Sequence, residues 1–381
     1  MHDVAIVGSG PVGTLLQAEL ARLGVDATVL ERRARPTAGS RAVGVHAAAL
    51  TALEASGATA RILDCALRVT RGEARAAGSL GVVRFDRAGA RHPYVATLPQ
   101  SSTERALAET AVAWGASAVV RGCAVERVED GHGSVRLRVR RGEADGVEHA
   151  RIVVIATGSA GRAVSSLTAA ARTRTYPDRY VMTDAPDATG EGPTAVVHLH
   201  PDGVLESFPL PEGMRRFVAW QGARDADADP AGWLRGAIAR RAGSTQAATV
   251  VTAATTFGVR RALVPHMRDG RVFAIGDAAH EVSSIGGQGM NLGLVDAATL
   301  APLLASWVHS GDAPDAELRE WDRRRRRAAT TSARIAAANT VIGRAVGPLA
   351  HRAQTTALRG ILRSPAADIL ARAYSMGLDP G

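Results

Sequence analysis

The stretch Asp3-Val4-Ala5-Ile6-Val7-Gly8-Ser9-Gly10-Pro11-Val12-Gly13 decides the fold of the first part of the chain. Its first five residues predict a short buried strand that runs directly into three glycines, and residues 11–23 carry apolar side chains at helical spacing. A second strand is expected at residues 27–30, with Glu31 at its end. This order of strand, glycine loop, helix, strand and acid is typical of a dinucleotide-binding unit.

The three glycines of this loop suit a nucleotide site. Gly8, Gly10 and Gly13 together permit a tight turn, close approach of the backbone to a pyrophosphate, and close packing of the helix. The helix N-terminus offers free N–H groups and partial positive charge to the phosphates. Glu31, 18 residues after Gly13, is placed to accept hydrogen bonds from an adenosine ribose. An acid here disfavours a 2′-phosphate, so the site suits FAD or NAD rather than NADP.

A second motif, Gly276-Asp277-Ala278-Ala279-His280, follows a strand expected at residues 271–275. The Asp277 carboxylate therefore emerges at the carboxyl end of a strand, where ligands of open α/β sheets bind. The glycine-rich stretch 286–291 then leads into another helix, whose N-terminal amides could face a bound ring system and stabilise an anion on it. We interpret His280 as a packing and hydrogen-bonding residue rather than a proton donor.

Taken together, the two motifs resemble the class A FAD-dependent monooxygenases, the p-hydroxybenzoate hydroxylase-like family of aromatic ring hydroxylases. The resemblance implies that Asp277 binds a ribityl hydroxyl of FAD, that Arg41 lies near the pyrophosphate and the path of the nicotinamide cofactor, and that Gln100 contacts FAD. The complete set of predicted cofactor-binding residues is Gly8, Gly10, Pro11, Val12, Gly13, Glu31, Arg32, Arg41, Gln100, Gly276, Asp277, Gly286, Gly287, Gln288, Gly289, Met290 and Asn291.

The predicted fold class is α/β. The resemblance implies a glutathione-reductase-type Rossmann FAD-binding domain at residues 1–66, 100–175 and 257–312. Strand patterns and turn signals at residues 67–99 and 176–256 indicate an inserted mixed β-sheet that would bind the substrate. Residues 313–381 are expected to form a C-terminal helical segment.

Two departures from the family pattern stand out. The family usually carries an aspartate after the third strand of the FAD domain, whereas residues 157–161 here read Thr-Gly-Ser-Ala-Gly, without an acid. This puts normal handling of NAD(P)H in doubt. A proline often precedes the second glycine-rich stretch, and Ser283 and Ser284 stand there instead.

The leading functional hypothesis is an FAD-dependent monooxygenase of secondary metabolism that hydroxylates or epoxidises an aromatic or polyketide-like small molecule. By resemblance, NADPH or NADH reduces the flavin, and molecular oxygen forms the C4a-hydroperoxide that oxidises the substrate. Two alternatives stay open: a flavin reductase or dehydrogenase of the geranylgeranyl-reductase type, and a flavoprotein whose FAD has a non-redox role in a cyclase or scaffold. No catalytic residue is assigned. The substrate-contact candidates are Tyr180, His198, His200, Phe208 and Trp220.

Composition limits the partners. The formal charge of +9 includes the run Arg323–Arg327, which we interpret as a solvated helix face rather than a nucleic-acid site, because aromatic residues are only 4% of the chain. Two cysteines favour a reduced, cytoplasmic setting and give too few ligands for a metal site. We expect no membrane span, since no apolar run reaches roughly 20 residues, and either a monomer or a homodimer.

Overall fold

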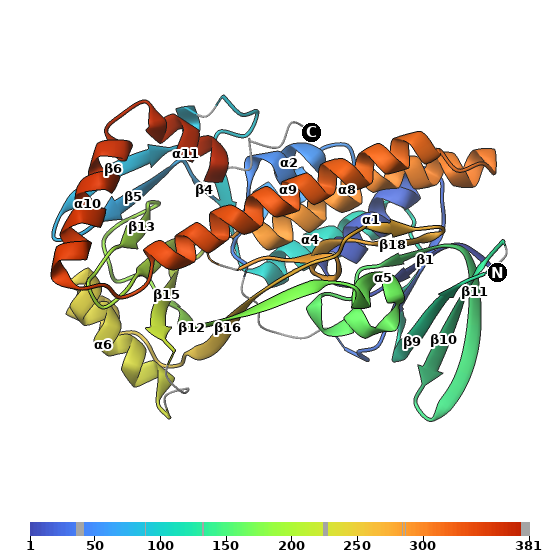
Figure 1. The fold of residues 1–381 in the computed structure, drawn as a ribbon, viewed down its shortest axis with the longest axis horizontal. Helices are drawn as coiled ribbons and strands as arrows, with labels where there is room; N and C mark the ends of the chain where they lie inside the picture. The colour runs from blue at the N-terminus through green and yellow to red at the C-terminus, as the bar shows by residue number, and fades with distance from the viewer. Residues whose placement is uncertain are drawn as a thin grey trace.

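The computed structural model describes residues 1–35, 42–87, 89–131, 133–223, 228–283, 285 and 287–374. Figure 1 shows an elongated α/β molecule with one sheet toward each end and helices along its length. The predicted fold class is confirmed: a nucleotide-binding sheet, a second mixed sheet and C-terminal helices. The domain boundaries proposed from the sequence stay a prediction.

The first sheet has eight strands and follows the order β17-β18-β11-β1-β2-β8, with β10 beside β11 and β9 beside β10. Its parallel centre joins β1 to β2 on one side and to β11 on the other. Its strands are β1 (His2–Val7), β2 (Ala27–Glu31), β8 (Val120–Arg121), β9 (Cys123–Asp130), β10 (Val135–Arg141), β11 (Ala144–Ile155), β17 (Arg268–Asp269) and β18 (Val272–Ala274).

The nucleotide unit is present within one residue of the predicted bounds. β1 leads through the glycine loop into helix α1 (Pro11–Arg22), and the chain returns as β2, parallel to β1. In β10, Val135, Leu137 and Val139 are buried and the arginines between them are exposed, an alternation typical of a strand with one buried face. The amino-terminal half of β11 pairs with antiparallel β10, and its carboxyl half pairs in parallel with β1.

The second sheet also has eight strands, in the order β19-β16-β12-β15-β14-β13-β5-β6. It combines strands from distant parts of the chain, because β5 pairs with β13 and β16 pairs with β12. Its strands are β5 (Arg71–Arg75), β6 (Ser79–Arg84), β12 (Arg172–Pro186), β13 (Ala195–His198), β14 (Leu205–Leu210), β15 (Met214–Gly222), β16 (Thr255–Leu263) and β19 (His280–Glu281). A small third sheet joins β3 (Gly44–Val45), β7 (Val95–Thr97) and β4 (Leu67–Val69).

Helices cover the sheets and connect them. In Figure 1 the long helix α9 (Asp315–Ile342) runs beside α8 (Gln288–Ser310) between the two large sheets, while α10 (Pro348–Leu362) and α11 (Ala366–Tyr374) lie near β5 and β6. The remaining helical elements are α2 (Ala47–Ala52), α3 (Ala58–Cys65), η1 (Phe85–Arg87), α4 (Gln100–Ala113), η2 (Ser159–Val164), α5 (Ser166–Ala169), α6 (Pro230–Ala242), α7 (Thr245–Thr249) and η3 (Gly276–Ala278).

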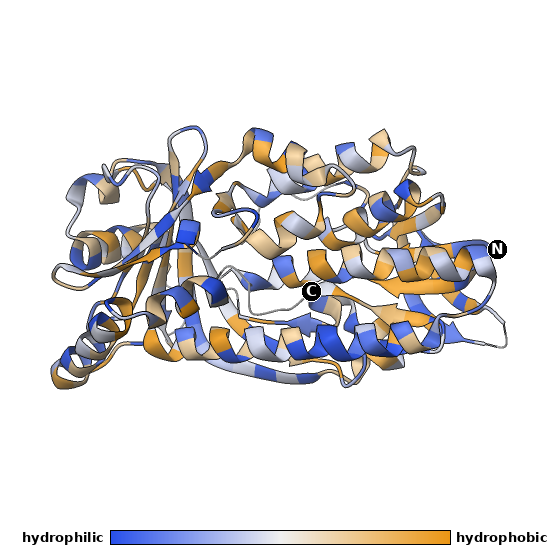
Figure 2. Ribbon diagram, turned by 90° about the horizontal axis from the view of Figure 1, so that it is seen from above, coloured by the Kyte–Doolittle hydropathy of each residue, from blue (hydrophilic) through white to orange (hydrophobic). Residues whose placement is uncertain are grey.

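Helix α8 is an apolar helix of the protein interior. Among the described residues it is the one helix that is long and apolar enough to cross a membrane by length and composition, a test that core helices also pass. In this structure, 61% of its most apolar stretch is buried inside the protein. Leu294, Leu300 and Leu304 pack into the main hydrophobic core, so we interpret α8 as a core helix. Figure 2 shows orange, hydrophobic residues along the inner strands and alternating blue and orange segments along the helices.

Helices α6 and α4 begin differently, and one arginine of α9 is unexpectedly buried. Asp229 caps α6, and Gly243 ends it in a left-handed conformation. Ser101 and Glu104 have the spacing of a capping box, but α4 begins at Gln100 after Pro99 without a side-chain cap among the described residues. In the run Arg323–Arg327, Arg325 is buried, and the solvated-face interpretation fails for this residue.

Candidate active site

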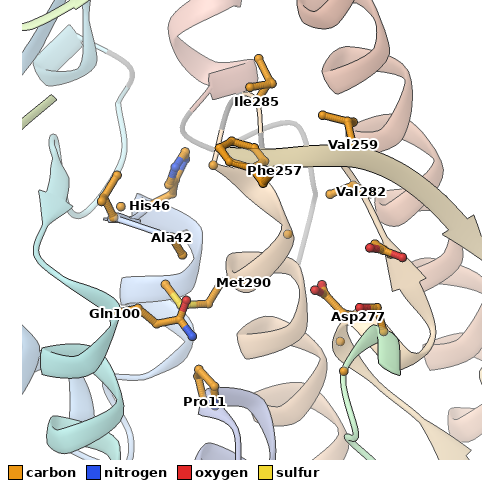
Figure 3. A pocket seen from close by; sticks show the side chains of 18 of the residues that line it. Pro11, Ala42, His46, Gln100, Phe257, Val259, Asp277, Val282, Ile285 and Met290 are labelled. Atoms are coloured by element: carbon orange, nitrogen blue, oxygen red, sulfur yellow. The ribbon is translucent and has the colours of Figure 1, made fainter. Parts of the chain in front are cut away.

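One large cavity of about 860 Å³ joins the nucleotide unit to the second sheet. Figure 3 shows Pro11, Gln100 and Met290 at one end of the view, Phe257 and Ile285 at the other, and Asp277 to the side. The lining therefore changes from backbone and polar groups near the glycine loop to apolar side chains at the second sheet. A volume of this size is within the range of cofactor and small-molecule sites.

The glycine loop is held by close backbone contacts. Gly8 has a φ of +107°, and a Cβ placed there would lie 2.6 Å from the carbonyl oxygen of Ala156. A Cβ on Gly13 would lie 2.1 Å from the carbonyl oxygen of Gly8. Gly10 is different, because nothing lies within 4 Å of a Cβ at that position. The loop therefore packs tightly on its protein side and leaves open space on its cavity side.

The N-terminus of α1 supports anion binding at this open space. Gly10 is the N-cap, and no side chain of the described residues caps the helix. The first N–H groups of an α-helix lack partners within the helix, and the helix dipole adds partial positive charge there. Gly10, Pro11 and Val12 all line the cavity, so a pyrophosphate would meet this helix end.

Glu31 ends β2 beside the glycine loop, and its carboxylate already accepts hydrogen bonds from two residues. Ser9 donates to it from its backbone N at 2.9 Å and from its hydroxyl at 3.2 Å, and Arg33 donates from its backbone N and its Nε, both at 2.9 Å. Burial opposes ionisation, but the hydrogen bonds from Arg33 and Ser9 lower the pKa of Glu31 to about 2. Because a carboxylate has about four acceptor positions, a ribose hydroxyl would have to displace one of these donors.

Asp277 lies in η3, between β18 and α8, and its exposed side chain lines the cavity. Arg162 holds this turn from the side: it donates to the carbonyl oxygens of Asp277 at 2.5 Å and Ala278 at 3.3 Å, and to Glu281 at 2.9 Å. The turn that carries Asp277 is thus fixed to η2, the segment that follows β11.

The segment Thr157–Gly161, where the family aspartate is absent, also lines the cavity. Gly158 has a φ of +67°. A Cβ on Gly161 would lie 2.4 Å from the Cβ of Thr157, so the turn needs glycine at that position. The turn thus stays close to the site even though it carries no carboxylate.

Behind η3, a fully buried ionic cluster joins three elements. His280 Nε2 lies 2.5 Å from an Asp296 carboxylate oxygen, and Arg325 Nε donates to the other oxygen at 2.8 Å. Asp296 also accepts from the backbone N of Gly276 at 3.0 Å. Burial opposes both charges, yet Asp296 raises the pKa of His280, while His280 and Arg325 lower the pKa of Asp296 to about 2. This agrees with the interpretation of His280 as a hydrogen-bonding residue.

The structure brings most of the predicted cofactor residues to the cavity. The lining includes Gly8, Gly10, Pro11, Val12, Glu31, Arg32, Gln100, Gly276, Asp277, Gly287, Gly289 and Met290. Gly13, Gln288 and Asn291 are not among the lining residues. Arg41 and Gly286, together with Ser284, lie outside the described residues.

Asn291 has a structural role in this arrangement. Its side-chain oxygen accepts from the backbone N of His46 at 2.8 Å, and its side-chain nitrogen donates to the carbonyl oxygens of Gly44 and Gly287, both at 2.9 Å. It therefore fixes the start of α8 against the segment between β3 and α2. His46 lines the cavity as a result.

Several lining residues were missed in the sequence analysis. Arg33, His46 and Cys123 line the cavity, and Arg162 fixes the turn that carries Asp277. Arg33 lies two residues after the predicted acid Glu31, so its position was a usable signal. The other three carried no local signal, because each reaches the site only through pairing between distant segments.

Of the five predicted substrate-contact residues, Phe208 lines the cavity. Tyr180 is buried and stacks on Phe257 with ring centroids 5.7 Å apart. Trp220 donates to Asp178 at 2.8 Å, and His200 accepts from the backbone N of Asp202 at 3.1 Å. Together with His198, these residues are not among those lining the cavity.

The residues present fit FAD. Gly10 leaves space where a side chain would obstruct a pyrophosphate, the uncapped start of α1 faces that space, and the Asp277 carboxylate lies in the same cavity. The cavity therefore has room for a dinucleotide between the glycine loop and the start of α8, and it extends further along the apolar side chains of the second sheet.

Comparison with known proteins gives consistent matches. Residues 1–336 match the family described as FAD binding domain. The chain is 32% identical to a rifampicin monooxygenase of Streptomyces venezuelae over 342 residues, which cover 87% of this chain and 69% of the relative. It is 31% identical to a 12-dehydrotetracycline 5-monooxygenase/anhydrotetracycline 6-monooxygenase of Streptomyces rimosus, covering 85% and 66%. The chain thus spans about two thirds of the length of these curated relatives.

Solved structures show the same fold. An anhydrotetracycline hydroxylase from Streptomyces rimosus superposes with a TM-score of 0.80 at 28% identity, covering 98% of this chain and 76% of that chain. A p-nitrophenol 4-monooxygenase from Pseudomonas putida superposes with a TM-score of 0.84 at 20% identity, covering 99% and 97%, and supports the fold alone.

Proposed function

The chain belongs to the class A FAD-dependent monooxygenases, the p-hydroxybenzoate hydroxylase-like family, and we propose that it transfers one oxygen atom to an aromatic, polyketide-like small molecule. FAD, NAD(P)H and molecular oxygen are the cofactor and co-substrates of this family. The proposal rests on the cavity that connects the glycine loop and Asp277 with the apolar face of the second sheet.

In this proposal the protein binds, orients and excludes water. The start of α1 holds the pyrophosphate, and Asp277 accepts a hydrogen bond from a hydroxyl of the cofactor chain. When bound, FAD supplies the redox chemistry that activates oxygen. Phe257, Val259 and Ile285 give the substrate an apolar wall, which keeps water away from the reacting atoms.

We further propose a reduced, cytoplasmic setting in secondary metabolism and a monomer or homodimer. Cys65 and Cys123 are both free thiols, which supports a reducing environment. The substrate class is supported by the relatives named above, which are monooxygenases of rifampicin and of tetracycline precursors.

The test is to purify the protein with its FAD and follow loss of flavin absorbance anaerobically with NADH and then NADPH. Hydroxylated naphthalenes and anthraquinones would be added in turn, followed by ¹⁸O₂ and mass spectrometry of the product. Reduction that leads to a product with one labelled oxygen atom supports the monooxygenase. Reduction with a hydrogenated product and no labelled oxygen would favour the reductase alternative. Bound FAD that is never reduced would favour a non-redox role and direct attention to residues 157–161.

A further inference from the structure

Glu206 places a carboxylate in the apolar wall of the cavity, whereas Glu73 and Glu281, which also line the cavity, are each ion-paired with an arginine. Glu206 is on β14, where alternation places it on the same face as Val204 and Phe208, and all three line the cavity. Leu205, on the opposite face, packs with Ala237 of α6 in a separate cluster. The orientation of Glu206 is therefore fixed by the sheet and not by a mobile loop.

The strand neighbours of Glu206 give it no polar partner. Its cross-strand neighbours are Val197 on β13 and Val218 on β15, and both line the cavity. Within the described part of the chain, no group hydrogen-bonds its carboxyl group, although the side chain is only 9% exposed. Burying a carboxyl group without a hydrogen-bond partner costs free energy, and burying its ionised form costs more.

Burial alone raises the pKa of Glu206 to about 7. The charged groups nearest to this wall are already paired: Arg216 binds Asp184 at 2.6 and 2.7 Å, Glu73 binds Arg75 at 2.6 Å, and Arg260 lies 3.5 Å from Glu281. Tyr180 on β12 and His198 on β13 are the other titratable groups close by. Burial together with the charge of Glu206 raises the pKa of Tyr180, and burial lowers that of His198 to about 4, so both stay neutral near pH 7.

We propose that Glu206 accepts the hydrogen bond, and during reaction the proton, of a phenolic hydroxyl on the substrate. The inference rests on the proposed function and names the group through which the cavity would recognise its substrate. When the substrate O–H bond breaks, the proton moves to a Glu206 oxygen and the electron pair stays on the phenol oxygen, from which it enriches the ring. An electron-rich ring carbon is what an electrophilic oxygen donor attacks.

The surroundings favour a neutral phenol over an ammonium group. A cation paired with Glu206 would have to lose its hydration in the same apolar wall. The free-energy cost of this desolvation offsets much of the Coulomb attraction within a buried ion pair. A phenol has an ordinary pKa near about 10, like tyrosine, and enters the wall uncharged. Its flat apolar ring then contacts Val218 and Phe257 while its hydroxyl reaches the Glu206 carboxylate.

The experiment compares 2-naphthol with 2-methoxynaphthalene, which has the same ring system but no donor. Binding to the FAD-loaded protein is followed through the change in flavin absorbance, from about pH 5 to about pH 9. Wild type should bind 2-naphthol more tightly than 2-methoxynaphthalene, and this ratio of affinities should grow to about tenfold or more as Glu206 ionises at about pH 7. Glu206→Gln is nearly isosteric and removes a lone buried charge, so it should fold and keep FAD. It should lose the pH-dependent preference, whereas the control Glu73→Gln should retain it.

The outcomes separate the two proposals, because binding is measured without turnover. Equal preference in wild type and Glu206→Gln, binding of neither compound, or tighter Glu206-dependent binding of a naphthyl ammonium would overturn the inference. If wild type shows the preference but never gives a labelled product with any phenol, the role of Glu206 in binding stands and the monooxygenase proposal fails. If oxygen insertion proceeds equally in Glu206→Gln at every pH, the proposed function stands and this inference fails.

Discussion

Substituting alanine for Gly13 should destabilise the protein by about 2 kcal/mol, whereas the same change at Gly10 should leave stability nearly unchanged and weaken FAD binding. A Cβ on Gly13 would lie 2.1 Å from the carbonyl oxygen of Gly8, far inside the roughly 3.5 Å at which carbon contacts become favourable. Gly8 is itself closely packed, because a Cβ on its α-carbon would lie 2.6 Å from the carbonyl oxygen of Ala156. Overpacking costs about 1–3 kcal/mol, and the short contact puts Gly13→Ala at the upper end of this range. The better helix propensity of alanine offsets up to about 1 kcal/mol of that cost, which leaves the net loss of about 2 kcal/mol.

Gly10→Ala is the matched control in the same loop. Gly10 has a φ of −73°, which any residue adopts, and a Cβ there meets nothing within 4 Å. Its effect on the free energy of unfolding should stay within about 0.5 kcal/mol, since the small loss at the N-cap and the gain from a less flexible unfolded chain oppose each other. The new methyl group would, however, occupy the space proposed for the pyrophosphate. We expect FAD affinity to fall about tenfold or more, equal to roughly 1.4 kcal/mol.

The assays are urea unfolding of the FAD-free proteins and titration with FAD followed by flavin fluorescence. If the slope of the unfolding transition is unchanged, a lower midpoint for Gly13→Ala measures the lost stability directly. A Gly13→Ala protein as stable as wild type would refute the packing argument. A Gly10→Ala protein that binds FAD as tightly as wild type would refute the placement of the pyrophosphate.

Three further predictions concern the groups behind the cavity. Asp296→Asn should lower the free energy of unfolding by about 3–5 kcal/mol, because it removes the buried carboxylate charge to which Arg325 donates, and an unchanged urea midpoint would contradict this. Because the pKa of His280 is raised in the folded protein, its ion pair stabilises the fold fully below about pH 6.5, and this stabilisation is lost as the pH rises through the raised pKa. The urea midpoint should fall over that pH range in wild type but not in His280→Gln. Arg162→Ala should weaken FAD binding several-fold, because the η3 carbonyls lose their donor, while Arg260→Ala should not; equal FAD affinity in both variants would count against a positioning role.

The nucleotide unit could be predicted from sequence because its constraints are local. Gly8, Gly13 and Glu31 belong to one strand–loop–helix–strand segment, and the chemistry of a tight turn and an uncapped helix restricts which residues can occupy it. What sequence spacing did not show is that the Glu31 carboxylate is shared with Ser9 and Arg33. Those hydrogen bonds depend on how the loop closes over the end of β2.

The buried cluster behind η3 marks the limit of reasoning from composition. Arg325 lies inside a run of five arginines, and such a run usually indicates a solvated helix face. One turn of α9 nevertheless directs Arg325 at Asp296 on α8, while Arg323 and Arg324 remain exposed. Arg325 is buried and its neighbours are exposed because α9 packs against α8 along one side. A helix packed in this way buries one face, even where consecutive residues are of the same type.

The apolar wall of the cavity shows why residue type is a weak guide to a binding face. The aromatic and histidine side chains predicted to contact substrate were chosen by residue type, and of these Phe208 lines the cavity. Alternation assigns residues of a strand to two faces, but it does not say which face meets the ligand. Here α6 covers one face, through contacts with Leu205, and so leaves the other to the cavity. Once that side is known, the informative residue is Glu206, because an unpaired carboxyl in an apolar wall needs a partner that the described protein does not supply.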